Sequence, residues 1–242
     1  MTEFNRAIKT GVAVSGGDPV LTMPSPARAE PASPSSTRDN LLAAASALMR
    51  ARDTLSVSIS DIAAEAGVNS ALVKYYFGNK NGLLLALLER DLTLSITQLR
   101  ELVEMDLRPS QKMRFHLRGL IRIYFRFPYL NRLLIAIIRD EPEEIGREIA
   151  DKYLRPISEA YERMIAEGVA AGEFKPIDAR FFYFTAIGAC DQIFSARFVL
   201  RHLHGIEAID DDLRRAYVDQ VITLIMEGLL AEPAEARLSA PG

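Results

Sequence analysis

Apolar residues recur at three- and four-residue intervals from residue 37 almost to the end of the chain. This spacing places them along one face of an α-helix. The first such segment carries Leu41, Ala45, Leu48 and Met49, and Thr37 is its expected N-cap. No segment alternates β-branched and polar residues between turn signals, so we expect no sheet. The pattern predicts an all-α fold.

Local signals for helix ends divide the chain into successive helices. Ser58, with Asp61 three residues later, has the spacing of a capping box at the start of the second helix, and Gly67 ends that helix. Gly78 interrupts the chain before Asn79, which is expected to cap a long apolar helix. The later helices are predicted to cover residues 69–76, 80–105, 109–127, 130–138, 143–171, 178–203 and 211–230.

Residues 1–36 differ in composition from the rest of the chain. They contain five of the twelve prolines, three glycines and a single aromatic residue, Phe4. Such a segment cannot bury enough apolar surface to offset the entropy lost on ordering, so we expect a disordered extension. An arm that enters a DNA minor groove is the alternative, although its charges cancel. Residues 232–242 are predicted to form a flexible tail.

The overall composition is that of a globular protein, with 49% hydrophobic and 25% charged residues. The single cysteine, Cys190, excludes an intramolecular disulfide framework and fits a reducing compartment. The longest apolar run, from Leu83 to Leu88, is far shorter than the roughly 20 residues of a membrane helix. The N-terminus carries no secretory signal. We therefore expect a soluble, cytoplasmic protein that does not enter membranes.

A short helix, a tight turn at Gly67 and a second short helix follow one another between residues 58 and 80, which is the helix-turn-helix arrangement. Val73 and Phe77 share one face of the second helix and are expected to pack on the first. The opposite face carries Ser70, Ala71, Lys74 and Tyr75, flanked by Asn69, Leu72 and Tyr76. Such a face can approach a major groove and form hydrogen bonds with base edges and phosphates.

This stretch resembles the TetR family of one-component bacterial transcriptional regulators. The matching residues are Ile62-Ala63, Ala66-Gly67-Val68, Val73, Tyr76-Phe77, Asn79-Lys80 and Leu83-Leu84. The resemblance is strong over residues 37–84, and beyond them it is one of architecture rather than of motif. It implies a helix-turn-helix DNA-binding domain at residues 37–84, joined to an effector-binding and dimerisation domain at residues 85–231.

The resemblance implies a set of DNA-contacting residues when it is carried over position by position. They are Ser58, Ser60, Asn69, Ser70, Ala71, Leu72, Lys74, Tyr75, Tyr76 and Lys80. Lys80 is expected to bind phosphate together with the free amides at the start of its helix. Ser58 also serves as a helix cap, and the alternative for Tyr76 is packing. Lys74 stands where the family usually has tyrosine and Leu72 where threonine is frequent, so base preference does not transfer from relatives.

The charge of the DNA-binding domain favours a dimer. Residues 37–82 carry five basic and four acidic side chains, a net charge of +1, so one such domain binds DNA weakly. A homodimer places two recognition helices about a two-fold axis, which fits a near-palindromic operator. In the resembling family the last two helices pair with their copies. The expected interface residues are Phe194, Phe198, Tyr217, Val221, Leu224 and Ile225; the alternative is that all belong to the intramolecular core.

The resemblance also implies an unidentified small-molecule effector. The residues predicted to line its site are Phe115, Arg122, Tyr124, Phe127, Tyr161, Met164, Phe184, Cys190 and Asp191, with core packing as the alternative for each. Arg114, Arg118, Arg122 and Arg126 form a basic stripe at four-residue intervals. The stripe favours either ion pairs with the acids Asp140, Glu141, Glu143 and Glu144 or an anionic effector, such as an acyl-CoA or an aromatic carboxylate.

Catalysis has little support in the sequence. Cys190 has no evident histidine partner, and His202 and His204 are spaced by two, which does not align them on a helix. No Gly-rich phosphate loop is present. We therefore expect no enzymatic activity, metal or cofactor. The sequence predicts a ligand-responsive transcriptional regulator, acting as a repressor. The alternative is an all-α small-molecule-binding or enzymatic protein whose helix-turn-helix is only structural.

Overall fold

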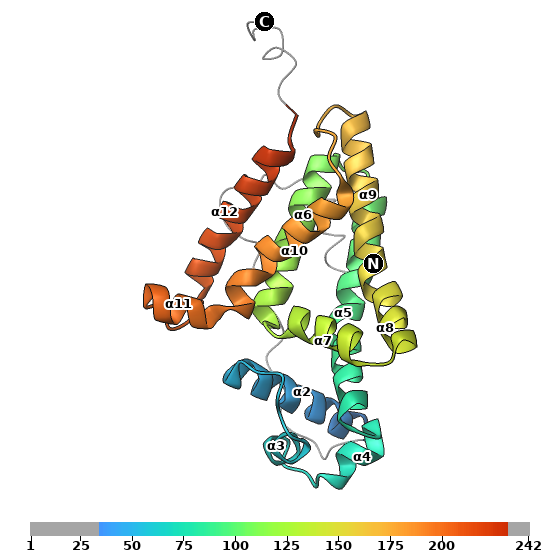
Figure 1. Ribbon diagram of the computed structural model, residues 1–242, viewed down its shortest axis with the longest axis vertical. Helices are drawn as coiled ribbons and strands as arrows, with labels where there is room; N and C mark the ends of the chain where they lie inside the picture. The colour runs from blue at the N-terminus through green and yellow to red at the C-terminus, as the bar shows by residue number, and fades with distance from the viewer. Residues whose placement is uncertain (1–33, 232–242) are drawn as a thin grey trace, which may run out of the picture. The chain divides into compact units, whose positions relative to one another are not determined.

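The computed structural model describes residues 34–231. The predicted extension and tail therefore lie outside the described residues, except for residues 34–36, which are helical. Figure 1 shows the arrangement of the helices. In chain order they are α2 (Pro34–Arg52), α3 (Ile59–Glu65), α4 (Ala71–Phe77), α5 (Lys80–Glu104), α6 (Pro109–Arg126), α7 (Leu130–Asp140), α8 (Glu143–Ile149), the π-helix η1 (Ala150–Leu154), α9 (Arg155–Ala170), α10 (Ala179–Ser195), α11 (Arg197–His204) and α12 (Asp211–Leu229).

The all-α prediction is confirmed for the described part of the chain. Its regular elements are all helices, and an isolated β-bridge joins Phe174 to Leu230. Within residues 34–231, none of the helices is both long and apolar enough to cross a membrane.

The helix α2 and the two short helices α3 and α4 form with the start of α5 a unit that we call the head (Figure 1). The predicted capping box is present, because Ser58 Oγ accepts a hydrogen bond from the Asp61 amide at 3.0 Å and the Asp61 carboxylate accepts one from the Ser58 amide. Gly67 and Gly78 have φ angles of +66° and +74°. Both turns therefore need a residue without a Cβ, as the sequence predicts.

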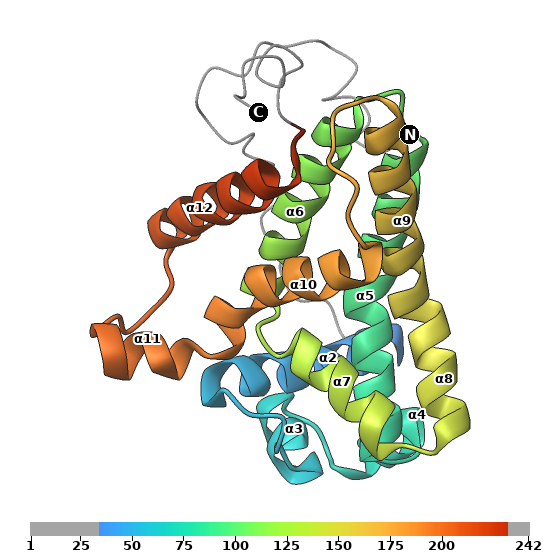
Figure 2. The same cartoon turned by 45° about the horizontal axis from the view of Figure 1, so that its top comes forward.

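The rest of the chain, from the middle of α5 onward, forms a larger unit that we call the body. α5 packs against α6 and α9, while α10 packs on α6 and α9 from the other side. α12 packs along α6, and α7 lies beside α5 where the body meets the head (Figure 2). α5 thus runs from the head into the body, so a movement of its neighbours in the body can reach the head.

Buried polar groups join the head to the body. The Tyr129 hydroxyl, just before α7, lies 2.6 Å from Asp91 Oδ2 in α5 and 2.8 Å from Ser46 Oγ in α2. All three residues are buried. Burial raises the pKa of the Asp91 carboxyl, although the hydrogen bond from Tyr129 and the nearby Arg90 act in the opposite direction. The hydroxyl of Tyr129 therefore links three helices at one point.

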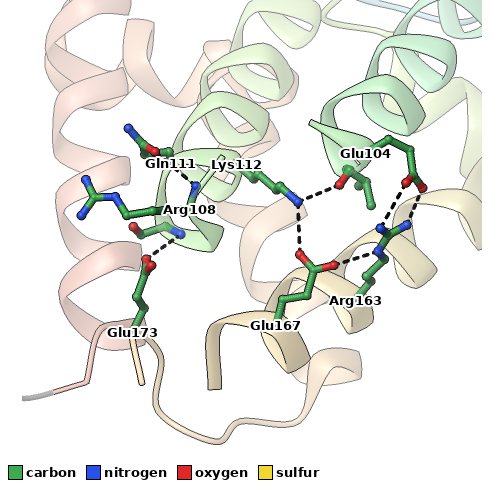
Figure 3. A network of polar contacts seen from close by, with 9 residues as sticks. Glu104, Arg108, Gln111, Lys112, Arg163, Glu167 and Glu173 are labelled. Carbon is green, nitrogen blue, oxygen red and sulfur yellow. Dashed lines mark hydrogen bonds and ion pairs between the residues drawn. The ribbon is translucent and has the colours of Figure 1, made fainter. Parts of the chain in front are cut away.

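At the opposite end of the body, a network of polar contacts fixes the ends of three helices (Figure 3). Lys112, which is only 5% exposed, donates to the Val103 carbonyl at 2.7 Å and to Glu167 Oε2 at 3.2 Å. Arg163 joins Glu167 to Glu104. The C-terminus of α5 is therefore held against α6 and α9.

Two predicted helices are interrupted in the structure. The helix predicted for residues 143–171 consists of α8, η1 and α9, with a wider π turn between the two α-helices. Pro156 follows that turn, and a proline has no amide to donate and clashes with the carbonyl four residues earlier. The helix predicted for residues 178–203 breaks at Ala196, whose φ and ψ of −118° and 35° are not helical. That break separates α10 from α11.

The first helix begins earlier than predicted. α2 starts at Pro34, so Thr37 lies inside it and is not its N-cap. Proline is favoured in the first turn of a helix, because the missing amide would have had no intrahelical partner there. The predicted cap at Asn79 is confirmed, because Asn79 Oδ1 accepts from the Gly82 amide at 2.9 Å. Gly172, with a φ of +70°, follows the end of α9.

Candidate functional site

The solvent-facing side of α4 is the surface that the sequence predicts for DNA contact. Tyr75 is 79% exposed, and Lys74, Ser70 and Ala71 are exposed as well. Val73, on the other side of the helix, is fully buried. The helix therefore presents a cation, a phenol and two small residues to solvent. This combination can enter a major groove and meet both base edges and phosphates.

Leu72 and Tyr76, which flank this surface, are half-buried and pack against the core. The Tyr76 ring meets the Tyr75 ring edge-on, with 5.0 Å between the ring centres, and lies 6.3 Å from the Phe77 ring. Edge-to-face aromatic pairs are mutually attractive. Tyr76 therefore supports Tyr75, and the packing role that the sequence suggests for Tyr76 is present.

Ser58, Ser60 and Asn69 form local hydrogen bonds at the starts of the short helices. Ser58 Oγ, the cap of α3, lies 2.9 Å from Ser60 Oγ. Asn69 Oδ1 accepts from the Ala71 amide at 2.8 Å, so α4 begins two residues later than predicted. The three residues are exposed, so their polar side chains remain within reach of a ligand on this surface.

Lys80 is the first residue of α5, a helix long enough for its free N-terminal amides to favour an anion. Arg38, in α2, brings a second cation to the same region. Its guanidinium lies 5.3 Å from the centre of the Phe77 ring, at the end of α4. Arg38 has no signal in the sequence, because this contact joins positions far apart in the chain and no spacing rule connects them.

Carboxylates of the head are neutralised by nearby arginines. Asp61 lies 2.9 Å from Arg52, and Asp53 lies 2.6 Å from Arg132 and 3.4 Å from Arg197, which belong to the body. The hydrogen bond from Arg52 holds the pKa of Asp61 below its ordinary value. These pairs reduce the repulsion that the acids of the head would exert on a polyanion.

Five residues predicted to line an effector site gather inside the body. Tyr124, Tyr161, Met164, Cys190 and Asp191 come from α6, α9 and α10, and all of them are buried. Burial raises the pKa of the Cys190 thiol to about 12, so the thiol stays protonated and is a poor nucleophile. The interior therefore contains aromatic side chains and an uncharged cysteine thiol.

Three other residues predicted to line that site do not lie in this buried interior. Phe115 and Phe184 are 41% and 73% exposed, and Arg122 also faces solvent. Phe127 is half-buried near the head, where the guanidinium of Arg126 lies 5.0 Å from its ring centre. α6 and α10 carry apolar residues on more than one face, so the sequence does not reveal which face turns inward.

The basic stripe of α6 does not pair as one sequence-based alternative suggested. Asp140 pairs with Arg139 at 2.6 Å and Glu143 pairs with Arg147 at 2.5 Å. Arg118 of the stripe instead approaches a carboxylate of α12, at 3.9 Å. Asp140 and Glu143 therefore pair with arginines outside the stripe and do not neutralise it.

A buried histidine lies next to the interior tyrosines. His116 Nε2 lies 3.0 Å from the Tyr161 hydroxyl, and the two rings meet edge-on with 5.1 Å between their centres. Burial lowers the pKa of His116 from 6.5 to about 4. The folded protein therefore keeps this ring neutral at a pH at which the unfolded chain protonates it.

We expect His116 to make the fold sensitive to acid. Between pH 6.5 and 4 the unfolded chain binds a proton that the folded state excludes, so stability falls as the pH falls. The loss at pH 5 relative to pH 7 is about 2 kcal/mol. His116→Gln should remove it, as measured by urea unfolding of both proteins at the two pH values. The raised pKa of Asp191 acts in the opposite sense in both proteins and cancels in the difference.

Equal pH dependence of parent and His116→Gln would show that the imidazole is protonated in the folded state. Asp191→Asn is the matched control, because it removes a buried carboxyl whose pKa is raised rather than lowered. It should make the fold more sensitive to acid, since the parent gains stability when that carboxyl takes up a proton.

The predicted dimer-interface residues divide into three groups by their exposure in the single chain. Phe194, Val221 and Ile225 are buried within the single chain, where they belong to its core. Tyr217 is half-buried, and its hydroxyl donates to the Ala189 carbonyl at 2.6 Å. Leu224 and Phe198, in contrast, are 61% and 55% exposed.

α10 leaves an apolar surface exposed to solvent. Phe181 is 71% and Phe184 is 73% exposed, and Gly188, one turn beyond Phe184, is also exposed. Leu224 contributes an exposed side chain from α12. We call Phe181, Phe184, Gly188 and Leu224 the α10–α12 face. Large apolar side chains at such exposure are typical of protein interaction sites.

The head and the body together define a class of protein: an all-α regulator with a helix-turn-helix at one end and a helical domain with an aromatic interior at the other. Residues 41–87 match the family model described as bacterial regulatory proteins, tetR family. Residues 106–235 match the model described as tetracyclin repressor-like, C-terminal domain. The chain belongs to the tetR family of DNA-binding transcriptional regulators.

Solved structures show the same fold at low sequence identity. The ketosteroid transcriptional regulator KstR2 of Mycobacterium tuberculosis is 16% identical with a TM-score of 0.66, over 81% of this chain and 96% of that one. A tetR-family regulatory protein from Rhodococcus RHA1 is 17% identical with a TM-score of 0.66, and the match covers 81% of this chain and 98% of that one. The regulator FadR from Bacillus subtilis, solved in complex with stearoyl-CoA, is 20% identical with a TM-score of 0.55. The match covers 78% of this chain and 98% of that one. A search among curated proteins gave no match.

Proposed function

We propose that the protein is a ligand-responsive repressor that binds a near-palindromic operator as a homodimer. The observation that carries the proposal is the solvent-facing side of α4, where Lys74 and Tyr75 stand free of the core next to the anion-favouring start of α5. The α10–α12 face supports the homodimer, since a two-fold axis through it would bring two heads to one duplex.

The effector proposed here has a large apolar part and an anionic end, as an acyl-CoA has. The interior tyrosines and Met164 favour an apolar ligand, and the exposed basic stripe of α6 favours an anion. The FadR structure, which contains stearoyl-CoA, belongs to a protein of the same fold. Stearoyl-CoA should raise the unfolding temperature of this protein, whereas coenzyme A alone should not.

In the proposed mechanism, the effector and the operator prefer different orientations of the heads. Effector binding in the body shifts the population of head orientations, and α5 carries the change to α4. Because the coupling is reciprocal, operator DNA must weaken effector binding by the same factor. Binding of a stearoyl-CoA analogue, measured with and without operator, checks this reciprocity.

An electrophoretic shift assay with the DNA that flanks the protein's own gene tests the proposed function. We expect a retarded complex that resists competition by random duplex and dissociates when effector is added. A protein that binds neither duplex would instead support the alternative, an all-α small-molecule-binding or enzymatic protein with a structural helix-turn-helix.

Lys80 is expected to bind phosphate rather than to read bases. Lys80→Ala should therefore weaken binding to operator and to random duplex by similar factors. It should also make the plot of log affinity against log salt shallower by about one per lost contact, or about two per dimer. Lys74→Ala, by contrast, should change the preference among operator variants. A salt titration of parent and variants on both duplexes measures these effects, and an unchanged slope for Lys80→Ala would contradict the assignment.

A further inference from the structure

Asp53 lies just beyond the C-terminal end of α2, where the head meets the body. Its backbone has a φ of +49°, in the left-handed region that aspartate and asparagine tolerate better than most residues. Its side chain is 23% exposed. A partly buried carboxylate on a constrained backbone can hold its partners in a defined geometry.

Two arginines from different helices of the body bind this carboxylate. Arg132 of α7 donates to Asp53 Oδ1 at 2.6 Å, and Arg197 of α11 lies 3.4 Å from Asp53 Oδ2. Arg197 also donates to the Arg50 carbonyl, in the last turn of α2. The C-terminal carbonyls of a helix carry partial negative charge, so the guanidinium of Arg197 stabilises the end of α2 in two ways. We call these contacts the Asp53 clasp.

Both arginines are connected to α10, Arg197 along the chain and Arg132 through a hydrogen bond of its neighbour. Arg197 is separated from the end of α10 by Ala196 alone, at the break between α10 and α11. Arg132 follows Asn131, whose side-chain amide donates to Asp191 Oδ2 in α10 at 2.9 Å. A displacement of α10 would therefore act on the clasp through both arginines.

The clasp lies at a distance from the other contact between α2 and the body. The Tyr129 hydroxyl meets α2 at Ser46, seven residues before Asp53. Seven residues of helix span about 10 Å. Polar contacts thus hold α2 to the body at two points, in addition to the continuous helix α5, so loss of the clasp removes the restraint at the C-terminal end of α2.

We propose that the Asp53 clasp sets the orientation of the head according to the position of α10, separately from the connection through α5. When the clasp is closed, the recognition helix keeps one orientation relative to the body. When α10 and the α11 that follows it shift, the two arginines leave Asp53 and the head turns. The role of this device in regulation rests on the function proposed above, but its control of head orientation does not.

The experiment measures the distance between a spin label in the head, at Glu65→Cys, and one in the body, at Ala166→Cys. Both positions are exposed, whereas Cys190 is fully buried and so escapes labelling. Labelled protein is diluted with unlabelled protein so that distances within one chain dominate. Asp53→Asn removes the charge and keeps a residue that tolerates the same φ. Arg197→Gln removes the second partner. Arg201→Gln, in the same helix but paired with Glu207, is the matched control.

The parent and Arg201→Gln should give one narrow distance distribution. Asp53→Asn and Arg197→Gln should each broaden it by about twofold, and the double variant should add little, because both changes open the same contact. A distribution in Asp53→Asn as narrow as that of the parent, with the same mean, would overturn the proposal. This result does not depend on DNA binding or on dimer formation.

The second measurement is affinity for an operator selected with the parent protein from random duplexes. Asp53→Asn and Arg197→Gln should bind it about tenfold more weakly than the parent, because the heads are no longer held in the binding orientation. Arg201→Gln should bind as the parent does. Broadened distances with unchanged affinity would reject the regulatory role and leave the clasp as a structural contact. If the parent selects no duplex, the proposed function fails, while the distance measurement still decides whether the clasp orients the head.

Discussion

Phe184→Glu is expected to give a folded monomer. The side chain is 73% exposed on the single chain, so a carboxylate there meets water and costs the fold little. In a two-fold dimer formed through the α10–α12 face, the same substitution buries two carboxylates without partners. The cost is on the order of 3 kcal/mol for each uncompensated buried charge. Light scattering should show the mass falling to that of one chain, and circular dichroism should remain that of the parent.

Two further substitutions compare the α10–α12 face with a buried and an exposed apolar position elsewhere. Phe194→Glu should unfold or aggregate the protein, because Phe194 is 2% exposed and lies in the core of the chain. Leu94→Glu, at a position on α5 that is 62% exposed, should leave both fold and dimer unchanged. If Phe184→Glu still forms a dimer of parental stability, the α10–α12 face is not the interface.

Lys74→Ala and Tyr75→Ala are each expected to abolish operator binding in an ordinary shift assay without affecting the fold. A good base contact is worth about 1–3 kcal/mol, and a dimer loses it twice, so the affinity should fall between roughly thirtyfold and twenty-thousandfold. Both side chains point away from the core, so the unfolding temperature should change little. Fluorescence anisotropy with labelled operator measures the loss.

Arg100→Ala is the charge-matched control for Lys74→Ala. Arg100 is an exposed cation on α5, away from α4, and its loss should leave specific binding intact. Parental affinity in either Lys74→Ala or Tyr75→Ala would show that a different face of the head meets DNA. A loss equal for all duplexes would place both residues on the phosphates rather than on the bases.

The sequence determines the helix-turn-helix because the signals that build it are local. Ser58 and Asp61 satisfy free amides of one short helix, and Asn79 does the same for α5. Gly67 stands where the backbone requires a positive φ. These preferences act within three or four residues, so they are readable without any knowledge of tertiary contacts. The exposed face of α4 follows from them, because Val73 fixes which side of the helix turns inward.

The interior of the body was only partly predictable. Tyr161 and Cys190 are buried as expected, but Phe115 and Arg122 face solvent. Helical spacing shows which residues share a face, and it does not show which of two apolar faces meets the neighbouring helix. The π turn η1 had a visible signal in Pro156, which follows it, but apolar spacing alone does not register a proline.

The sequence by itself determined the all-α class, the caps of α3 and α5 and the solvent-facing side of α4, since each depends on residues that are neighbours in the chain. Tertiary structure alone decided what the apolar residues of α10 do. That helix carries four consecutive aromatic residues, 181–184, which point around its whole circumference. Packing against α6 and α9 buries Phe182 and leaves Phe184 exposed. The Asp53 clasp was likewise decided by tertiary structure, because its charges come from three helices and meet only when the chain has folded.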